Sequence, residues 1–345
     1  MAATPPPDPR VTRWLYSVAI ITFCLIVFGG FVRLNRAGLS IVEWNPVVGI
    51  APPMTEAAWT TEFAKYQATP EYLTVNHAMT LGEYKTIFYI EWAHRLIARL
   101  AGLAVVLPLV VFLWRGTIRW RDSALFLGIA LLFALQGFLG WFMVRSGLLE
   151  TPAVSHYRLT IHLLMAMLLL AITLWAAMNR DARIGPAIRR MGDTPASRVA
   201  LATLAIVTVQ IAWGGFVAGL KAGHVSYSWP LMGGALVPAG LFAGADSWWA
   251  SISSLPAAVH WLHRWFAFVV FAAVAGLVLI ARGRTVSRAA HQAIHAAAML
   301  VGVQIALGVS VLLWHVPVSL ALLHQAVGLG IFTAMLVANH RLLRA

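Results

Sequence analysis

Long apolar stretches separated by short polar segments dominate the hydropathy pattern of this chain. A helix that crosses a bilayer needs roughly 20 consecutive, mainly apolar residues, and eight stretches satisfy this requirement. They cover residues 14–33, 87–114, 123–144, 159–178, 199–220, 257–281, 289–314 and 316–339. The pattern therefore predicts an all-α integral membrane protein with eight transmembrane helices.

Composition supports a membrane protein. The chain of 345 residues is 60% hydrophobic and 11% charged, with a mean hydropathy of +0.79, whereas soluble domains are about 25% charged. Its formal net charge of +13 is concentrated in the segments expected on the inner side, as positive-inside topology requires. Both termini are thus predicted to be cytoplasmic, and no nucleic-acid partner is needed to explain the charge. The single cysteine, Cys24, excludes an intramolecular disulfide.

The sequence contains an internal repeat. Residues 29–49 read GGFVRLNRAGLSIVEWNPVVG, and residues 214–234 read GGFVAGLKAGHVSYSWPLMGG, with eight identities at a constant offset of 185 positions. Further along, EWAHR at 91–95 aligns with HWLHR at 260–264 at an offset of 169. Because each half holds four helices, both halves have the same orientation, unlike the inverted repeats of many transporters. The fold class expected is two pseudo-symmetric, parallel four-helix bundles.

This repeat predicts the domain organisation. A cytoplasmic N-terminal segment is followed by one bundle with a long outer loop, a basic cytoplasmic linker and a second bundle. The expected boundaries are 1–13 for the N-terminal segment, 14–178 for the first bundle with its outer loop at 34–84, 179–198 for the linker and 199–340 for the second bundle.

Each half contains two histidines within its apolar stretches, His94 and His162 in the first and His263 and His324 in the second. Ionisable residues inside a membrane usually face the protein interior or a cavity, and imidazole is a common axial ligand of haem iron. The four residues are expected at similar depth in the outer half of the membrane. The pattern predicts two bis-histidine haem sites, and their equal depth argues against electron transfer across the bilayer.

Charged residues accompany these histidines. Arg95 and Arg264 directly follow the first histidine of each half, and guanidinium groups suit planar carboxylates such as haem propionates. Glu91 lies one helical turn before His94, whereas His260 occupies the aligned position in the second half. A carboxylate at one site alone predicts different roles for the two halves. Glu91 is a candidate proton acceptor or stabiliser of a developing cation; the alternative is an ion pair with Arg95.

The ordered motifs resemble those of the haem A synthase family. The resemblance covers about residues 14–340 and rests on GGFVRLNRAGLSIVEWNP, EWAHR at 91–95, YRLTIHL at 157–163, WGGFVAGLKAG at 213–223, and the WLHRW and LLHQ segments around His263 and His324. With Cys24 alone, the chain resembles the cysteine-free subgroup of proteobacteria and mitochondria.

The resemblance implies a substrate site and a cofactor site. Haem O would bind in the N-terminal bundle, where His94 and His162 match the substrate-site histidines and Glu91 matches the essential carboxylate. Haem b would be the cofactor in the C-terminal bundle, with His263 and His324 as its ligands. The implied reaction oxidises the C8 methyl of haem O to a formyl group through hydroxylated intermediates, giving haem A, with water as the expected oxygen source.

The same resemblance suggests an environment and partners. We expect a multi-pass protein of the bacterial inner membrane with its haem sites toward the periplasm, in contact with lipid and with an electron acceptor that the sequence does not identify. Haem O synthase, cytochrome oxidase assembly factors and a second copy of the chain are further candidate partners. Two other functions are compatible with the residues: a dihaem cytochrome b that only transfers electrons, and a haem carrier. The sequence assigns no role to the remaining outer histidines, His77, His156, His224, His260 and His315.

Overall fold

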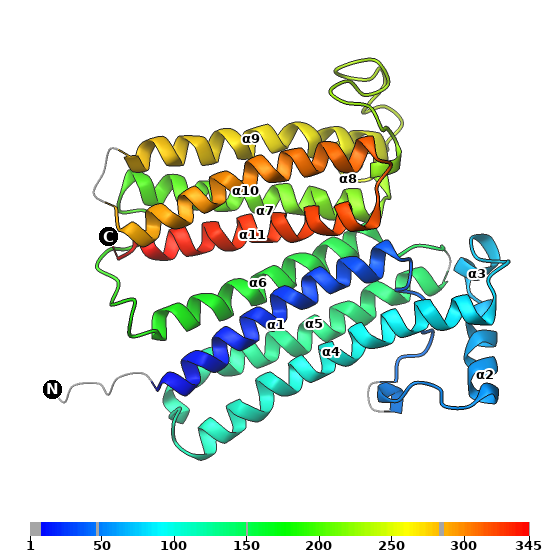
Figure 1. Ribbon diagram of the computed structural model, residues 1–345, viewed down its shortest axis with the longest axis horizontal. Coiled ribbons are helices and arrows are strands. Elements are labelled where there is room, and N and C mark those ends of the chain that lie inside the picture. The colour runs from blue at the N-terminus through cyan, green and yellow to red at the C-terminus, as the bar shows by residue number, and fades with distance from the viewer. Residues whose placement is uncertain (1–7, 46–47, 150, 283–285, 345) are drawn as a thin grey trace. The chain divides into compact units, whose positions relative to one another are not determined.

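The computed structural model describes residues 8–45, 48–149, 151–282 and 286–344, so residues 1–7 of the predicted N-terminal segment lie outside it, as does Arg284 of an inner loop. Among the described residues, every regular element is a helix (Figure 1). Eight helices are long and apolar enough to cross a membrane: α1 (Pro9–Leu34), α4 (Leu81–Trp114), α5 (Ala124–Leu149), α6 (His156–Arg180), α7 (Pro195–Gly219), α9 (Pro256–Arg282), α10 (Arg288–Leu313) and α11 (Val318–Leu342). The predicted all-α membrane architecture with eight spans is confirmed.

Shorter helices lie between the spans. They are η1 (Val48–Ile50), α2 (Glu56–Gln67), α3 (Pro70–Thr74), η2 (Trp120–Asp122), η3 (Ala222–His224) and α8 (Trp248–Ser253). The segment 34–84, expected only as a loop, thus contains α2 and α3. A threonine caps the N-terminus of each helix. The side chain of Thr55 accepts a hydrogen bond from the amide of Ala58, and that of Thr69 accepts one from the amide of Tyr72. Such caps satisfy amides that have no partner inside the helix.

A capping box explains why α4 begins earlier than its apolar stretch. The Thr80 side chain accepts a hydrogen bond from the backbone amide of Glu83, while the Glu83 carboxylate accepts one from the backbone amide of Thr80. These reciprocal bonds stabilise a polar first turn. The helix therefore starts at Leu81 rather than at residue 87, and its additional N-terminal turns provide a surface for α2.

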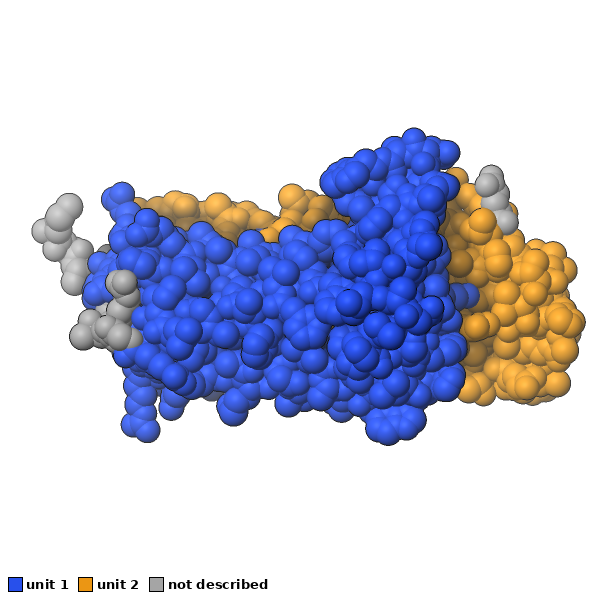
Figure 2. Space-filling model, turned by 90° about the horizontal axis from the view of Figure 1, so that it is seen from above, with its two compact units in different colours: residues 1–16, 171–345 blue, residues 17–170 orange. Residues whose placement is uncertain are grey.

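The chain divides into two compact units, one comprising residues 17–170 and the other residues 1–16 and 171–345 (Figure 2). In the second unit, α7 packs against α9 and α11, and α10 packs against the same two helices, so the four run alongside one another (Figure 1). In the first unit, α4 packs against α5 and α2. The domain boundaries expected from the repeat stay a prediction.

An aromatic cluster attaches α2 to the start of α4. Its buried members are Trp59 and Tyr66 of α2 and Tyr84 and Phe88 of α4. The ring centroids of Trp59 and Phe88 lie 5.0 Å apart, edge to face, and those of Tyr66 and Tyr84 lie 5.2 Å apart, stacked. Aromatic pairs in these geometries add about 0.5–1.5 kcal/mol each beyond their buried area. The outer segment is therefore a packed part of the first unit.

Candidate functional site

Each of the four predicted site histidines lies against a glycine of a neighbouring helix. A Cβ atom built on that glycine would come within 3.1–3.3 Å of the imidazole ring, tighter than almost all real Cβ contacts. The pairs are Gly29 with His94, Gly140 with His162, Gly214 with His263 and Gly308 with His324. The glycines occupy positions that align in the repeat, so each paired histidine packs against an equivalent glycine, although Gly29 faces Nε2 of His94 and Gly214 faces Cε1 of His263.

Hydrogen bonds also orient two of these rings in matching ways. The Nε2 atom of His162 lies 3.4 Å from the amide nitrogen of Gln136. In the second half, Nε2 of His324 lies 3.3 Å from that of Gln304. Such contacts fix which ring nitrogen faces a ligand.

The spacing of the second histidine pair fits two ligands of one metal. The Nδ1 atoms of His162, His263 and His324 are buried and have no hydrogen-bond partner, but the same is true of His260 and His340, so this feature does not single out the paired histidines. The ring centroids of His263 and His324 lie 6.3 Å apart. Two imidazoles on opposite sides of one metal, each about 2 Å from it, would have centroids about 6 Å apart. The second pair is therefore spaced like two axial ligands of one iron.

The number of candidate ligands in each half fits haem better than a metal ion bound by protein side chains alone. Within the described parts of the chain, no group of three or more His, Cys, Asp or Glu side chains is arranged to hold a metal ion. Metal sites made of protein alone usually use three or four side-chain ligands, whereas haem iron takes most of its ligands from the porphyrin. Pairs of histidines thus fit haem.

Glu91 is buried beside the first pair, with 3% of its surface exposed. Its Oε2 atom accepts hydrogen bonds from Oγ of Ser40 at 2.7 Å and from the amide of Ile41 at 2.9 Å. Its Oε1 atom accepts bonds from Nε of Arg95 at 3.0 Å and from Nη2 at 2.6 Å. The ion pair considered from the sequence is present, and two donors from the outer loop complete the carboxylate's environment.

Arg95 also binds the backbone of the outer loop. Its Nη2 atom donates to the carbonyl of Ile41 at 3.0 Å, and Nη1 donates to that of Glu43 at 3.3 Å. Its guanidinium carbon lies 5.8 Å from the ring centroid of Trp44, within range of a cation–π interaction. This use of the arginine was not expected from the sequence.

Arg264 makes the same contacts in the second half. It donates to the carbonyls of Ser226 and Ser228 at 3.1 and 3.0 Å, and its guanidinium carbon lies 6.0 Å from the ring of Trp229. These three residues align with Ile41, Glu43 and Trp44 at the offset of 185. The repeat offset relates the two loop contacts to each other once the contacts of one half are known.

His260 occupies the place of Glu91. It is buried, with 2% exposed, and its Nε2 atom accepts a hydrogen bond from Nε of Arg264 at 3.0 Å. The arginine thus keeps an acceptor one turn before it, but the acceptor is neutral imidazole instead of a carboxylate. The expected difference between the two halves is visible in these contacts.

Other histidines lie in separate environments. The Nδ1 atom of His224 lies 3.0 Å from the hydroxyl of Tyr227, whose ring centroid is 4.2 Å from that of His315. His340, near the end of α11, lies 3.0 Å from the Asn179 side chain and edge to face with Trp175.

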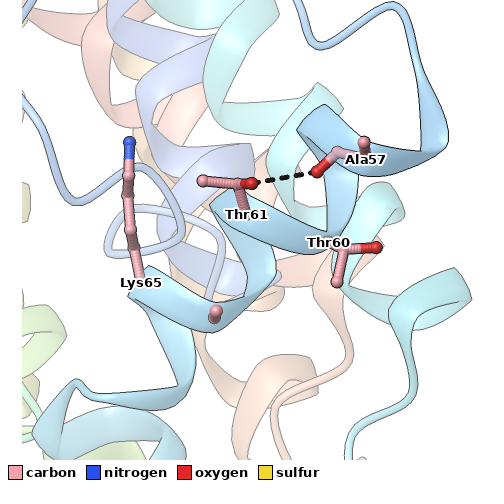
Figure 3. Close-up of a pocket in the computed structure, with 5 residues that line it drawn as sticks. Ala57, Thr60, Thr61 and Lys65 are labelled. Carbon is pink, nitrogen blue, oxygen red and sulfur yellow. Dashed lines mark hydrogen bonds between the residues drawn. The ribbon is translucent and has the colours of Figure 1, made fainter.

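A surface pocket on α2 lies in the outer segment (Figure 3). Its lining residues are Ala57, Thr60, Thr61, Ala64 and Lys65, and Thr61 donates a hydrogen bond to the carbonyl of Ala57 within the helix. Lys65 forms ion pairs with Glu43 and Glu62. The hydrogen bond from Lys65 lowers the pKa of Glu43, and that to Glu62 raises the pKa of Lys65. None of the paired histidines lines this pocket.

Comparison with known proteins gives full-length matches. The model of a family described as cytochrome oxidase assembly protein matches residues 12–336. A protein named heme A synthase from Sphingopyxis alaskensis is 41% identical, over 99% of this chain and 94% of the relative. Proteins of the same name from Rhodopseudomonas palustris and Flavobacterium psychrophilum are 40% and 38% identical, over 97% of this chain and 92% and 98% of the relatives.

Proposed function

The chain belongs to the cytochrome oxidase assembly protein family, and we propose that it acts as its curated relatives are named, as a haem A synthase. It is an oxidoreductase of the membrane that takes haem O as substrate and gives haem A as product. The structural observation that carries this proposal is the pair of histidine sites of which only one has a buried carboxylate. A protein that only transferred electrons between two haems, or only carried haem, would not need that asymmetry.

The N-terminal half holds the substrate. His94 and His162, each packed against a glycine of a neighbouring helix, would bind and orient haem O. With water as oxygen source, oxidation of a methyl to a formyl group releases four electrons and four protons. Glu91 is the nearby group suited to stabilise developing positive charge at the C8 methyl or to take up a released proton. Hydroxylated haem is the expected intermediate.

The C-terminal half would hold haem b. His263 and His324 are the residues that would hold it, a role supported by their 6.3 Å ring separation. Haem b bound there would supply one-electron redox chemistry, and the electron acceptor would lie outside the chain. The protein's contribution is to position the two imidazoles.

Arg95 and Arg264 have two roles in this proposal. Their bonds to loop carbonyls hold the outer loops at the ends of α4 and α9. Their positive charge beside the first histidine of each half also attracts haem propionates. The haem sites would then face the periplasmic side of the bacterial inner membrane. Haem O synthase, oxidase assembly factors and a second copy of the chain are the partners we expect there.

The test is co-expression with a haem O supply, followed by extraction and chromatography of the bound haems. We expect haem A and a hydroxylated intermediate in the extract, together with haem b. The His94→Ala variant should yield haem b but no haem A. Leu131→Ala is a matched control, because Leu131 is 70% exposed on α5. Recovery of haem b alone from the wild-type protein, with no haem A formed in the cells, would contradict the proposal.

A further inference from the structure

Resting on the role of Glu91 in the proposed function, we propose that Ser40 is the positioning residue that allows this buried carboxylate to exchange a proton without releasing the outer loop. Ser40 lies after the end of α1 and is fully buried. Its hydroxyl is within hydrogen-bond distance of two residues of α4 that are one helical turn apart, Ile87 and Glu91. Its hydroxyl is the rotatable donor to Glu91. The other donors are the amide of Ile41 and the guanidinium of Arg95.

The Ser40 hydroxyl has two acceptors within reach. Its Oγ atom lies 2.7 Å from Oε2 of Glu91 and 3.3 Å from the carbonyl oxygen of Ile87. A hydroxyl has one proton to donate and two lone pairs to accept. While Glu91 is ionised, the shorter, charge-assisted bond to its carboxylate is preferred. When Oε2 gains a proton, the Ser40 O–H rotates and donates to the carbonyl of Ile87. The protonated Oε2 then donates a hydrogen bond to Oγ of Ser40.

This exchange preserves the remaining contacts. The proton moves from the oxidised substrate, by way of water, to Oε2 of Glu91, and no covalent bond of the protein changes. Ser40 only redirects its O–H bond. Arg95 continues to bind Oε1 and the carbonyls of Ile41 and Glu43. A buried carboxylate with only rigid donors would lose a hydrogen bond, at substantial cost, whenever it was protonated.

Tyr84 fixes the backbone of Ser40 for this role. Its hydroxyl lies 3.2 Å from the carbonyl oxygen of Ser40 and 3.2 Å from that of Glu62. Tyr84 is fully buried in the aromatic cluster with Trp59 and Phe88. The outer segment thus holds the Ser40 backbone still while its side chain remains able to rotate.

The second half supplies an internal comparison. Val225 aligns with Ser40 at the offset of 185, and His260 stands where Glu91 stands. Arg264 nevertheless binds its loop through Ser226 and Ser228. The loop contact therefore does not require a hydroxyl at this position. The serine occurs together with the carboxylate, as expected if its function concerns the carboxylate rather than loop attachment.

The test compares Ser40→Ala, Ser40→Thr and the matched control Val225→Ser, each in the wild-type and Glu91→Gln backgrounds. Losing one buried, charge-assisted hydrogen bond of about 1.5–3 kcal/mol is expected to slow conversion of haem O roughly 10- to 100-fold in Ser40→Ala. Ser40→Thr, which keeps the hydroxyl, should recover most of the rate. Val225→Ser should not change it. In the Glu91→Gln background, Ser40→Ala should have no further effect.

Two measurements besides turnover separate positioning from a structural role. The infrared carboxylate band that disappears in Glu91→Gln should shift in Ser40→Ala and stay unchanged in Val225→Ser. Limited proteolysis within the described residues 41–45 and 48–56 should match the wild type in Ser40→Ala, whereas Arg95→Ala should increase it.

Wild-type turnover and an unshifted band in Ser40→Ala would overturn the proposal. So would an equal loss in both backgrounds, or proteolysis as fast as in Arg95→Ala. Failure of the wild-type protein to form haem A would instead refute the proposed function, so the two failures are distinguishable.

Discussion

Replacing Gly308 by alanine tests whether the close contact between Gly308 and the imidazole ring sets the position of His324. The new Cβ would lie 3.1 Å from Cε1 and 3.7 Å from Nδ1 of the imidazole, so the ring must move by a few tenths of an ångström. Overpacking of this kind costs about 1–3 kcal/mol. Replacing a helical glycine by alanine recovers about 1 kcal/mol of helix propensity. The net cost of about 0–2 kcal/mol corresponds to as much as roughly 30-fold weaker haem retention.

Gly302 provides the matched control for this variant. It lies on the same helix, α10, and a Cβ atom there would meet nothing within 4 Å. Gly302→Ala gains the same helix propensity without displacing an imidazole. The assay is the ratio of haem b to protein after purification, measured by the pyridine haemochrome spectrum, with the absorption spectrum reporting axial ligation. The reasoning would be refuted if Gly308→Ala left the haem content and the spectrum unchanged, or if Gly302→Ala lost as much haem as Gly308→Ala.

Three further predictions concern the paired sites and the outer segment. His263→Ala should lose the haem b spectrum whereas His94→Ala should retain it, and the opposite pattern would exchange the roles of the halves. Glu91→Gln should still bind haem but fail to complete the conversion of haem O, as extracted-haem chromatography would show; normal haem A production would remove Glu91 from the reaction. Lys65 holds the pKa of Glu43 below its ordinary value of 4.5, so their contact stabilises the outer segment above about pH 4.5 and is lost as the pH falls through the lower folded-state pKa. Protease protection of residues 41–45 and 48–56 should therefore fall only in acid, and loss of protection between pH 6 and 8 would contradict this.

The spans could be predicted because membrane burial requires long apolar helices. Each predicted stretch overlaps an observed helix, and the differences are at the ends. There, capping side chains such as Thr80 continue a helix past its apolar residues. Hydropathy does not register these polar caps, so it placed the start of α4 six residues late.

The outer segment could not be predicted from hydropathy. Helix α2 combines polar residues with Trp59 and Tyr66, which pack on Tyr84 and Phe88 of α4. Its stability depends on tertiary contacts between residues 18 to 29 positions apart, and an amphipathic helix of 12 residues has little stability by itself. The threonine caps at Thr55 and Thr69 were the local signal available.

The residues of the candidate site were chosen from the sequence and stay a prediction, whereas their contacts could not be predicted. Histidines and a carboxylate inside apolar helices are conspicuous, since such groups are costly in a membrane. The sequence did not show that Arg95 and Arg264 bind loop carbonyls, because a backbone acceptor has no residue signature. Nor did it single out Ser40, whose significance depends on a side-chain contact with Glu91 that crosses about fifty residues.

The most direct test of the account is the identity of the haems extracted from wild-type protein and from Glu91→Gln, each co-expressed with a haem O supply. We expect haem b in both, haem A only with the wild-type protein, and haem O or a hydroxylated intermediate retained by the variant. Haem b with no haem A from the wild type, or equal haem A from both, would contradict a reaction site in one half and a cofactor site in the other.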